Sequence, residues 1–144
     1  MTPPPAQKAV EGGGLPVWLS VTLDEKELGC LRSGETIEAL IEAVAQYQLE
    51  AVLLNCTSPE AVGVTMPRLR AVAAAEVQIG AYANGFVTAS SGAGEYDEEL
   101  TPEKYAEIAA GWVEDGASIV GGCCGIMPPH IEVLSNLVSA TEEE

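Results

Sequence analysis

Three cysteines in two separated segments are the residues of this chain best suited to chemistry. Cys123 and Cys124 are adjacent in the glycine-rich segment 121–125, and Cys56 follows Asn55 far upstream. Adjacent cysteines are poor disulfide partners, because neighbouring Cα atoms are about 3.8 Å apart and a disulfide needs about 4.4 to 6.8 Å. Zinc binds thiolates tetrahedrally, and a catalytic zinc site has three protein ligands and one open position. The three thiols therefore predict a zinc site with chemistry on sulfur.

Each thiol also has a plainer interpretation as a small buried side chain, which is common for free cysteine. That interpretation is the stronger one for Cys56 taken alone. For the adjacent pair the flanking glycines favour a functional role, because they let the backbone turn sharply and approach a ligand closely. Cys30 lies in a polar segment with no second thiol nearby, so we expect it to lie outside the metal site.

Composition limits the classes of function that fit the chain. Its 144 residues are 47% hydrophobic, which is typical of one globular folding unit. The formal net charge of -16 argues against binding to nucleic acid or to an anionic membrane surface, since both need a basic surface. No apolar run is long enough to span a bilayer, and the N-terminus does not resemble a signal peptide. With cysteines suited to a reducing compartment, these features predict a cytoplasmic protein.

Short apolar runs alternate with segments of helical periodicity along the chain. Continuous apolar strands indicate burial on both faces by crossover helices, so the pattern predicts an α/β fold with a parallel sheet. Ser33, Ser58 and Thr101 are expected to cap helices, and proline follows the last two. Strands are expected at 16–23, 51–55, 77–83 and 118–120, and helices at 35–48, 59–75, 101–114 and from 128 onward.

The pattern fits either a doubly wound sheet or part of a barrel, although no dinucleotide-binding glycine motif follows the first strand. In both architectures the functional groups collect at the C-terminal ends of the strands. Cys56 follows the second predicted strand, and Cys123 and Cys124 follow the fourth. We therefore expect the three thiols to meet at one edge of the sheet, with Tyr82 and Asn84 between them.

A set of short segments carries a family resemblance. These segments are Pro-Val-Trp-Leu-Ser at 16–20, Leu-Arg-Ser-Gly at 31–34, Leu-Asn-Cys at 54–56, Tyr-Ala-Asn at 82–84, Trp112, and Ile-Val-Gly-Gly-Cys-Cys-Gly-Ile-Met-Pro-Pro-His-Ile at 119–131. From Leu15 onward the chain resembles the homocysteine S-methyltransferase family, whose zinc-dependent enzymes methylate homocysteine to methionine. The resemblance implies that Cys56, Cys123 and Cys124 are the zinc ligands.

The resemblance also implies an architecture. The family fold is an eight-stranded TIM (β/α)8 barrel of about twice this length, and the chain resembles its second half, strands five to eight. Residues 1–14 are then an N-terminal extension with a remnant of the preceding helix, 15–140 the half barrel with its zinc site, and 141–144 an acidic tail. The family's N-terminal half, which holds the amino group of homocysteine, has no counterpart here. An open half barrel exposes strand edges, so we expect self-association or a complementary N-terminal half.

The implied reaction is methyl transfer to L-homocysteine from a sulfonium donor, S-methylmethionine or S-adenosylmethionine, with zinc as the cofactor and no further catalytic residue. Asn55 is expected to orient the site, and Tyr82 and Asn84 to line the substrate pocket, although structural roles explain all three as well. Trp112 is expected in the core, and His130 at the surface or as a helix cap.

Other functions also fit the chain. One alternative is a non-catalytic zinc-binding remnant, or a subunit that needs a separate N-terminal half. Another is the homocysteine-activating region of a cobalamin-dependent methionine synthase, which shares the fold. A redox module is weaker, because the chain has no Cys-x-x-Cys pair.

Overall fold

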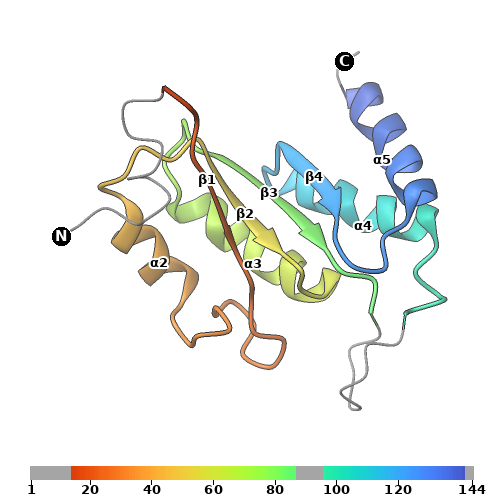
Figure 1. Ribbon diagram of the computed structural model, residues 1–144, viewed down its shortest axis with the longest axis horizontal. Helices are drawn as coiled ribbons and strands as arrows, with labels where there is room; N and C mark the ends of the chain where they lie inside the picture. Colours follow the sequence, from red (N-terminus) through yellow and green to blue (C-terminus); the bar gives the residue numbers. More distant parts are fainter. Residues whose placement is uncertain (1–13, 87–95, 142–144) are drawn as a thin grey trace.

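The computed structural model describes residues 14–86 and 96–141, and strands alternate with helices throughout (Figure 1). The predicted extension at 1–13 and tail at 142–144 lie outside the described residues. No helix in the described ranges is both long and apolar enough to cross a membrane. The strands are β1 (Trp18–Val21), β2 (Ala51–Asn55), β3 (Gln78–Ala83) and β4 (Ile119–Gly122), and the helices are α2 (Ile37–Val44), α3 (Pro59–Val72), α4 (Pro102–Glu114) and α5 (Pro128–Thr141).

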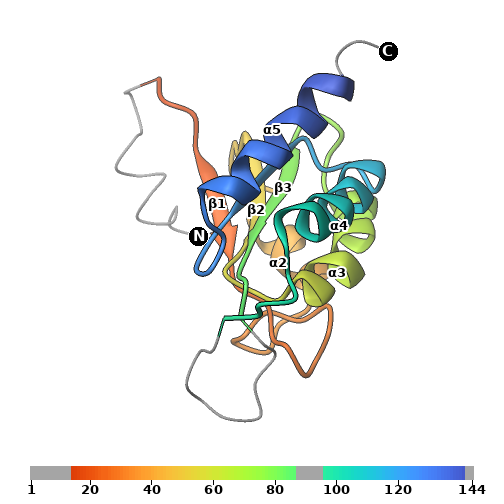
Figure 2. The same cartoon turned by 90° about the vertical axis from the view of Figure 1, so that its right-hand side faces the viewer.

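The four strands form one parallel sheet in the order β1-β2-β3-β4. Helices α2, α3 and α4 lie on one side of this sheet (Figure 2). The predicted α/β class with parallel strand-helix repeats is confirmed. Because the order follows the sequence, β1 and β4 are the two edges of the described sheet, and all four strands end on the same side.

The core lies between the sheet and its helices. Val52 and Leu54 of β2 are almost fully buried in it, as the continuous apolar run predicts. Trp112 of α4 is 1% exposed and packs edge to face against Tyr105, with ring centroids 5.7 Å apart. The prediction that Trp112 belongs to the core is confirmed.

Two of the three predicted helix caps are confirmed. The hydroxyls of Ser58 and Thr101 accept hydrogen bonds from the backbone amides three residues further on. For α2 the prediction is wrong, because Thr36 is the N-cap and not Ser33. Ser33 lies in the preceding turn, where its hydroxyl bonds to the Glu35 carboxylate, so α2 begins later than predicted.

Candidate metal centre

The loops after β2 and β4 bring the three predicted thiols together. The sulfur atoms of Cys56, Cys123 and Cys124 all lie within 4.8 Å of one another. Cys124 Sγ is 3.9 Å from Cys56 Sγ and 3.8 Å from Cys123 Sγ. Cys56 and Cys123 are half-buried and Cys124 is exposed, so solvent and a small molecule can reach the cluster. Cys30 is not part of this group.

Cys56 has an unusual backbone conformation at the start of its loop. Cys56 has a φ of +46°, a left-handed conformation that costs a residue with a side chain about 1 to 2 kcal/mol. Its amide donates to the Tyr82 carbonyl at 3.0 Å. The buried Thr57 secures the turn, since its hydroxyl donates to the Asn55 carbonyl and accepts from the Leu23 amide. Such strain persists only where the surroundings enforce it, and it is concentrated at functional sites.

The second loop is anchored to the end of β3. The amide of Cys123 donates to the Ala83 carbonyl at 2.8 Å, and the Cys124 carbonyl accepts from the Gly85 amide at 2.7 Å. These two bonds attach both cysteines to the last residue of β3 and to the segment that follows it. The two loops therefore reach the cluster from the strand ends on either side of β3, on the side of the sheet where all the parallel strands end.

The glycines around the pair permit a tight turn. Gly125 has a φ of +80°, which L-residues with side chains rarely adopt. At Gly122 an added Cβ would collide with the side chain of Ile126, so the chain packs closely there only without one. The expected sharp turn is found at Gly125, while close approach to a ligand stays a prediction.

Hydrogen bonding within the cluster moves the pKa values of Cys56 and Cys123 in opposite directions. The hydrogen bond to Cys123, together with burial, raises the pKa of Cys56 to about 11. Burial acts to raise the pKa of Cys123 as well, but hydrogen bonds from Cys56 and from the backbone and thiol of Cys124 lower it overall. The pKa of Cys56 is therefore held above that of Cys123, and a bound cation would offset the repulsion between thiolates at these distances.

The donor set fits a thiophilic metal ion such as zinc. Tetrahedral zinc with Zn–S bonds of about 2.3 Å places its sulfur ligands about 3.8 Å apart. The distances of 3.9 and 3.8 Å from the Cys124 sulfur match that spacing. Three thiolates leave one of four tetrahedral positions for a substrate, which is the composition of a catalytic site.

The residues predicted to bind substrate lie beside the thiols, and each has a partner within the chain. Asn55 Oδ1 accepts from the Thr22 hydroxyl at 2.8 Å. The Tyr82 hydroxyl reaches across β2 and donates to Ser20 at 2.8 Å. Asn84 is buried, and its side-chain oxygen accepts from the backbone amide two residues further on. Sequence reasoning missed Ser20 and Thr22, although hydroxyls two positions apart in a predicted strand share one face.

The only histidine in the chain is a capping residue. His130 Nδ1 accepts from the Met127 amide at 3.1 Å, so Nε2 carries the proton and donates to the Leu100 carbonyl at 2.9 Å. Of the two roles expected for His130, at the surface or as a helix cap, these bonds support the capping role. Sequence reasoning missed Tyr105, whose hydroxyl donates to the Gly121 carbonyl at 2.8 Å next to the cysteine loop.

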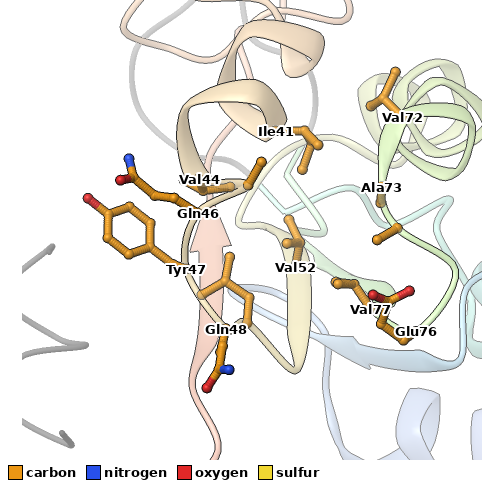
Figure 3. Close-up of a pocket in the computed structure, with 13 residues that line it drawn as sticks. Ile41, Val44, Gln46, Tyr47, Gln48, Val52, Val72, Ala73, Glu76 and Val77 are labelled. Carbon is orange, nitrogen blue, oxygen red and sulfur yellow. The ribbon is translucent and has the colours of Figure 1, made fainter. Parts of the chain in front are cut away.

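A cavity of about 490 Å³ lies at the opposite end of the sheet, before the starts of β2 and β3 (Figure 3). No cysteine or histidine is among the residues that line it. We therefore assign the chemistry to the thiol cluster. The side chains around this cavity include Ile41, Val44, Val52, Val72 and Val77.

Comparison with known families identifies the class of protein that carries this cluster. The model of the family described as homocysteine S-methyltransferase matches residues 6–138. The chain belongs to the homocysteine S-methyltransferase family. The family resemblance expected from the sequence is confirmed by this match.

Two curated relatives of the chain are methionine synthases from mycobacteria. The proteins from Mycobacterium leprae (strain TN) and Mycobacterium tuberculosis (strain ATCC 25618 / H37Rv) are each 34% identical over 130 residues. The aligned region covers 89% of this chain and 10% of each relative. The chain therefore spans about a tenth of the length of these relatives.

Solved structures of the Escherichia coli homocysteine methyltransferase MmuM share the fold. The metallated form superposes with a TM-score of 0.68 at 21% identity, and the oxidised form with a TM-score of 0.70 at 20% identity. Each match covers 92% of this chain and 39% of the MmuM chain. The chain therefore has the fold of part of a TIM barrel, as predicted.

Proposed function

We propose that residues 15–140 are the metal-binding half of a cytoplasmic, zinc-dependent homocysteine S-methyltransferase. The reaction is methyl transfer from a sulfonium donor, S-methylmethionine or S-adenosylmethionine, to L-homocysteine. The observation that carries the proposal is the cluster of three sulfur atoms within 4.8 Å of one another, in a chain of this family. Cys56, Cys123 and Cys124 are the ligands that would hold zinc.

The reaction forms a bond between the homocysteine sulfur and the donor's methyl carbon. The bond from that methyl carbon to the donor sulfonium breaks, and its electron pair stays on the donor sulfur, which becomes a neutral thioether. The homocysteine thiol must lose its proton first, because a free thiol with a pKa near 8.5 is mostly protonated at neutral pH. Bound zinc would supply this activation by lowering the pKa of the substrate thiol.

The chain's own residues shape the surface around the cluster. Asn55 of β2 and Tyr82 of β3 are held by the Thr22 and Ser20 hydroxyls, so both side chains are fixed before a substrate arrives. We assign Asn55 the role of orienting the site, and Tyr82 and Asn84 that of lining the substrate pocket. Fixed side chains lower the entropic cost of substrate binding.

A partner completes the enzyme in this proposal. The described sheet has β1 and β4 at open edges, and Trp18 on the β1 edge is 51% exposed. Open edges of parallel strands present unpaired backbone groups that favour pairing with another chain. The partner is either a second copy of this chain or a complementary N-terminal half that supplies the amino-group site for homocysteine.

The alternative is a zinc-binding remnant without catalysis. The chain spans 39% of the MmuM chain, so a large part of that enzyme has no counterpart in it. A remnant would retain the thiol cluster and bind zinc, but would form no methionine either alone or with a partner.

One set of measurements separates these functions. We would purify the chain, measure its bound zinc and its mass by light scattering, and assay methionine formation from homocysteine with each sulfonium donor. The assay would be repeated with the N-terminal half of a family enzyme added. Cys123→Ser is the control, because it removes one of the three donors at the cluster.

The proposal predicts about one zinc per cluster and methionine formation in at least one of the two assays, both lost in Cys123→Ser. Zinc binding without methionine in either assay would support the remnant. Zinc binding that survives Cys123→Ser unchanged would show that the metal site is wrong.

A further inference from the structure

One buried hydroxyl is hydrogen-bonded to the strand that leads into the cysteine loop. Tyr105 of α4 is fully buried, and its hydroxyl donates to the Gly121 carbonyl at 2.8 Å, two residues before Cys123. The Ala83 carbonyl of β3 accepts from the Cys123 amide at 2.8 Å. Tyr105 therefore bonds to β4 beside the point where Cys123 is attached to β3.

A second side chain holds the other end of the same loop. His130 accepts a hydrogen bond from the Met127 amide and donates one to the Leu100 carbonyl. Its ring packs edge to face on Tyr105, with centroids 6.0 Å apart and planes at 82°. The loop from Gly121 to Met127 is thus held at both ends by two side chains that touch each other.

The hydroxyl of Tyr105 is informative because it is not needed for packing. Phenylalanine would fill nearly the same space, and a buried hydroxyl costs free energy unless it is hydrogen-bonded. Burial raises the pKa of Tyr105, so the phenol stays protonated and remains a donor at neutral pH. A neutral donor in this place fixes the Gly121 carbonyl without adding charge near the thiolates.

We propose that Tyr105 and His130 are positioning residues that set the metal affinity of the cluster by fixing the two ends of the cysteine loop. The inference rests on the metal site proposed above. Metal ligands bind tightly when their donors are held in place beforehand, and loss of a supporting hydrogen bond typically weakens metal binding about 10- to 100-fold. Neither residue touches the substrate or the sulfur atoms in this proposal; both act through the backbone of the loop.

The test compares Tyr105→Phe with two matched controls. Tyr47→Phe makes the same chemical change in the segment between α2 and β2, at the opposite end of the sheet. Ile79→Val lowers stability in the core without touching the loop. Zinc affinity would be measured by competition with a chelator, and the visible spectrum of the cobalt-substituted proteins would report the geometry of the donors.

We expect the zinc dissociation constant to rise about tenfold or more in Tyr105→Phe, with an altered cobalt spectrum. The two controls should keep wild-type values in both measurements. His130→Ala should weaken zinc binding in the same direction, because it releases the Met127 end. An equal loss of zinc affinity in Ile79→Val and Tyr105→Phe would mean that lower overall stability explains the effect, and it would overturn the proposal.

A measurement on the metal-free protein separates this inference from the metal site itself. Tyr105→Phe should accelerate hydrogen exchange at the Cys123 amide, whereas Tyr47→Phe should not. If the wild-type chain binds no zinc, the proposed metal site fails, and amide exchange still decides whether Tyr105 restrains the loop. Unchanged exchange in Tyr105→Phe would overturn the restraint.

Discussion

Replacing Gly125 with alanine tests the coupling between the turn after Cys124 and the metal site. Gly125 has a φ of +80°, and a left-handed conformation costs an L-residue about 1 to 2 kcal/mol. The added Cβ would lie 2.8 Å from a ring carbon of Tyr96 and 3.1 Å from the Gly85 carbonyl oxygen. The Tyr96 ring is 64% exposed and can move, so we take the low end of the overpacking range, about 1 kcal/mol.

The two contributions add to about 2 to 3 kcal/mol of lost stability. For a chain of 144 residues this corresponds to a melting temperature lower by roughly 6 to 10 °C. Zinc affinity should fall as well, because the turn that carries Cys124 must rearrange. Thermal unfolding followed by circular dichroism and chelator competition would measure the two effects.

Two other glycines serve as controls. Gly34 has a φ of +104° and no atom within 4 Å of an added Cβ, so Gly34→Ala introduces strain without a collision. Gly111 lies inside α4 with open space around it, and Gly111→Ala should raise stability by about 0.5 to 1 kcal/mol. Only Gly125→Ala should weaken zinc binding. An unchanged melting temperature in Gly125→Ala, or an equal loss of zinc affinity in Gly34→Ala, would refute this reasoning.

Three further predictions concern the thiols, an ion pair and a helix cap. Cys124→Ser should weaken zinc binding about 100-fold or more, because one ligand supplies about a quarter of the 10 to 16 kcal/mol of binding free energy at a four-ligand zinc site. Cys30→Ser is the control and should leave the zinc content unchanged in the same titration. The hydrogen bond from Arg68 lowers the pKa of Glu38, so this pair stabilises the fold above pH about 4.5 and its contribution is lost as the pH falls through the folded-state pKa. Because both side chains are more than a third exposed, Glu38→Gln should cost at most about 1 kcal/mol at pH 7 in urea unfolding. The cost should shrink as the pH falls below about 4.5, and a cost that does not change with pH would contradict the assignment. Ser58→Ala should lower the free energy of unfolding by about 1 kcal/mol, and an unchanged value would show that the α3 cap does not contribute.

Local signals predicted the parts of the fold that depend on neighbours in the chain. The strand Ala51–Asn55 is a continuous apolar run because it is buried between sheet neighbours and helices, and its bounds match the prediction. Ser58 and Thr101 can be recognised as caps in the sequence, because each is followed by proline at the first helical position. The cap of α2 was wrong because Ser33 and Thr36 are both suitable residues, and only the turn between them decides where the helix begins.

The side-chain hydrogen bonds between strands could not be predicted from the sequence. The bonds from Tyr82 to Ser20 and from Thr22 to Asn55 depend on strand register, which one residue of slip would change completely. The contact of Tyr105 with Gly121 depends on how α4 packs against β4, and nothing in the local pattern distinguishes that tyrosine from a core aromatic residue.

The thiol cluster separates what the sequence predicts from what requires the tertiary structure. Residue type and position were sufficient to predict that Cys56, Cys123 and Cys124 would meet, because parallel strands joined by helices deliver their C-terminal ends to one side of a sheet. The sulfur spacing, the left-handed backbone at Cys56 and the restraints on the loop came only from the tertiary structure. They depend on contacts between segments far apart in the chain, and distances of a few tenths of an ångström decide whether three thiols can hold one metal ion.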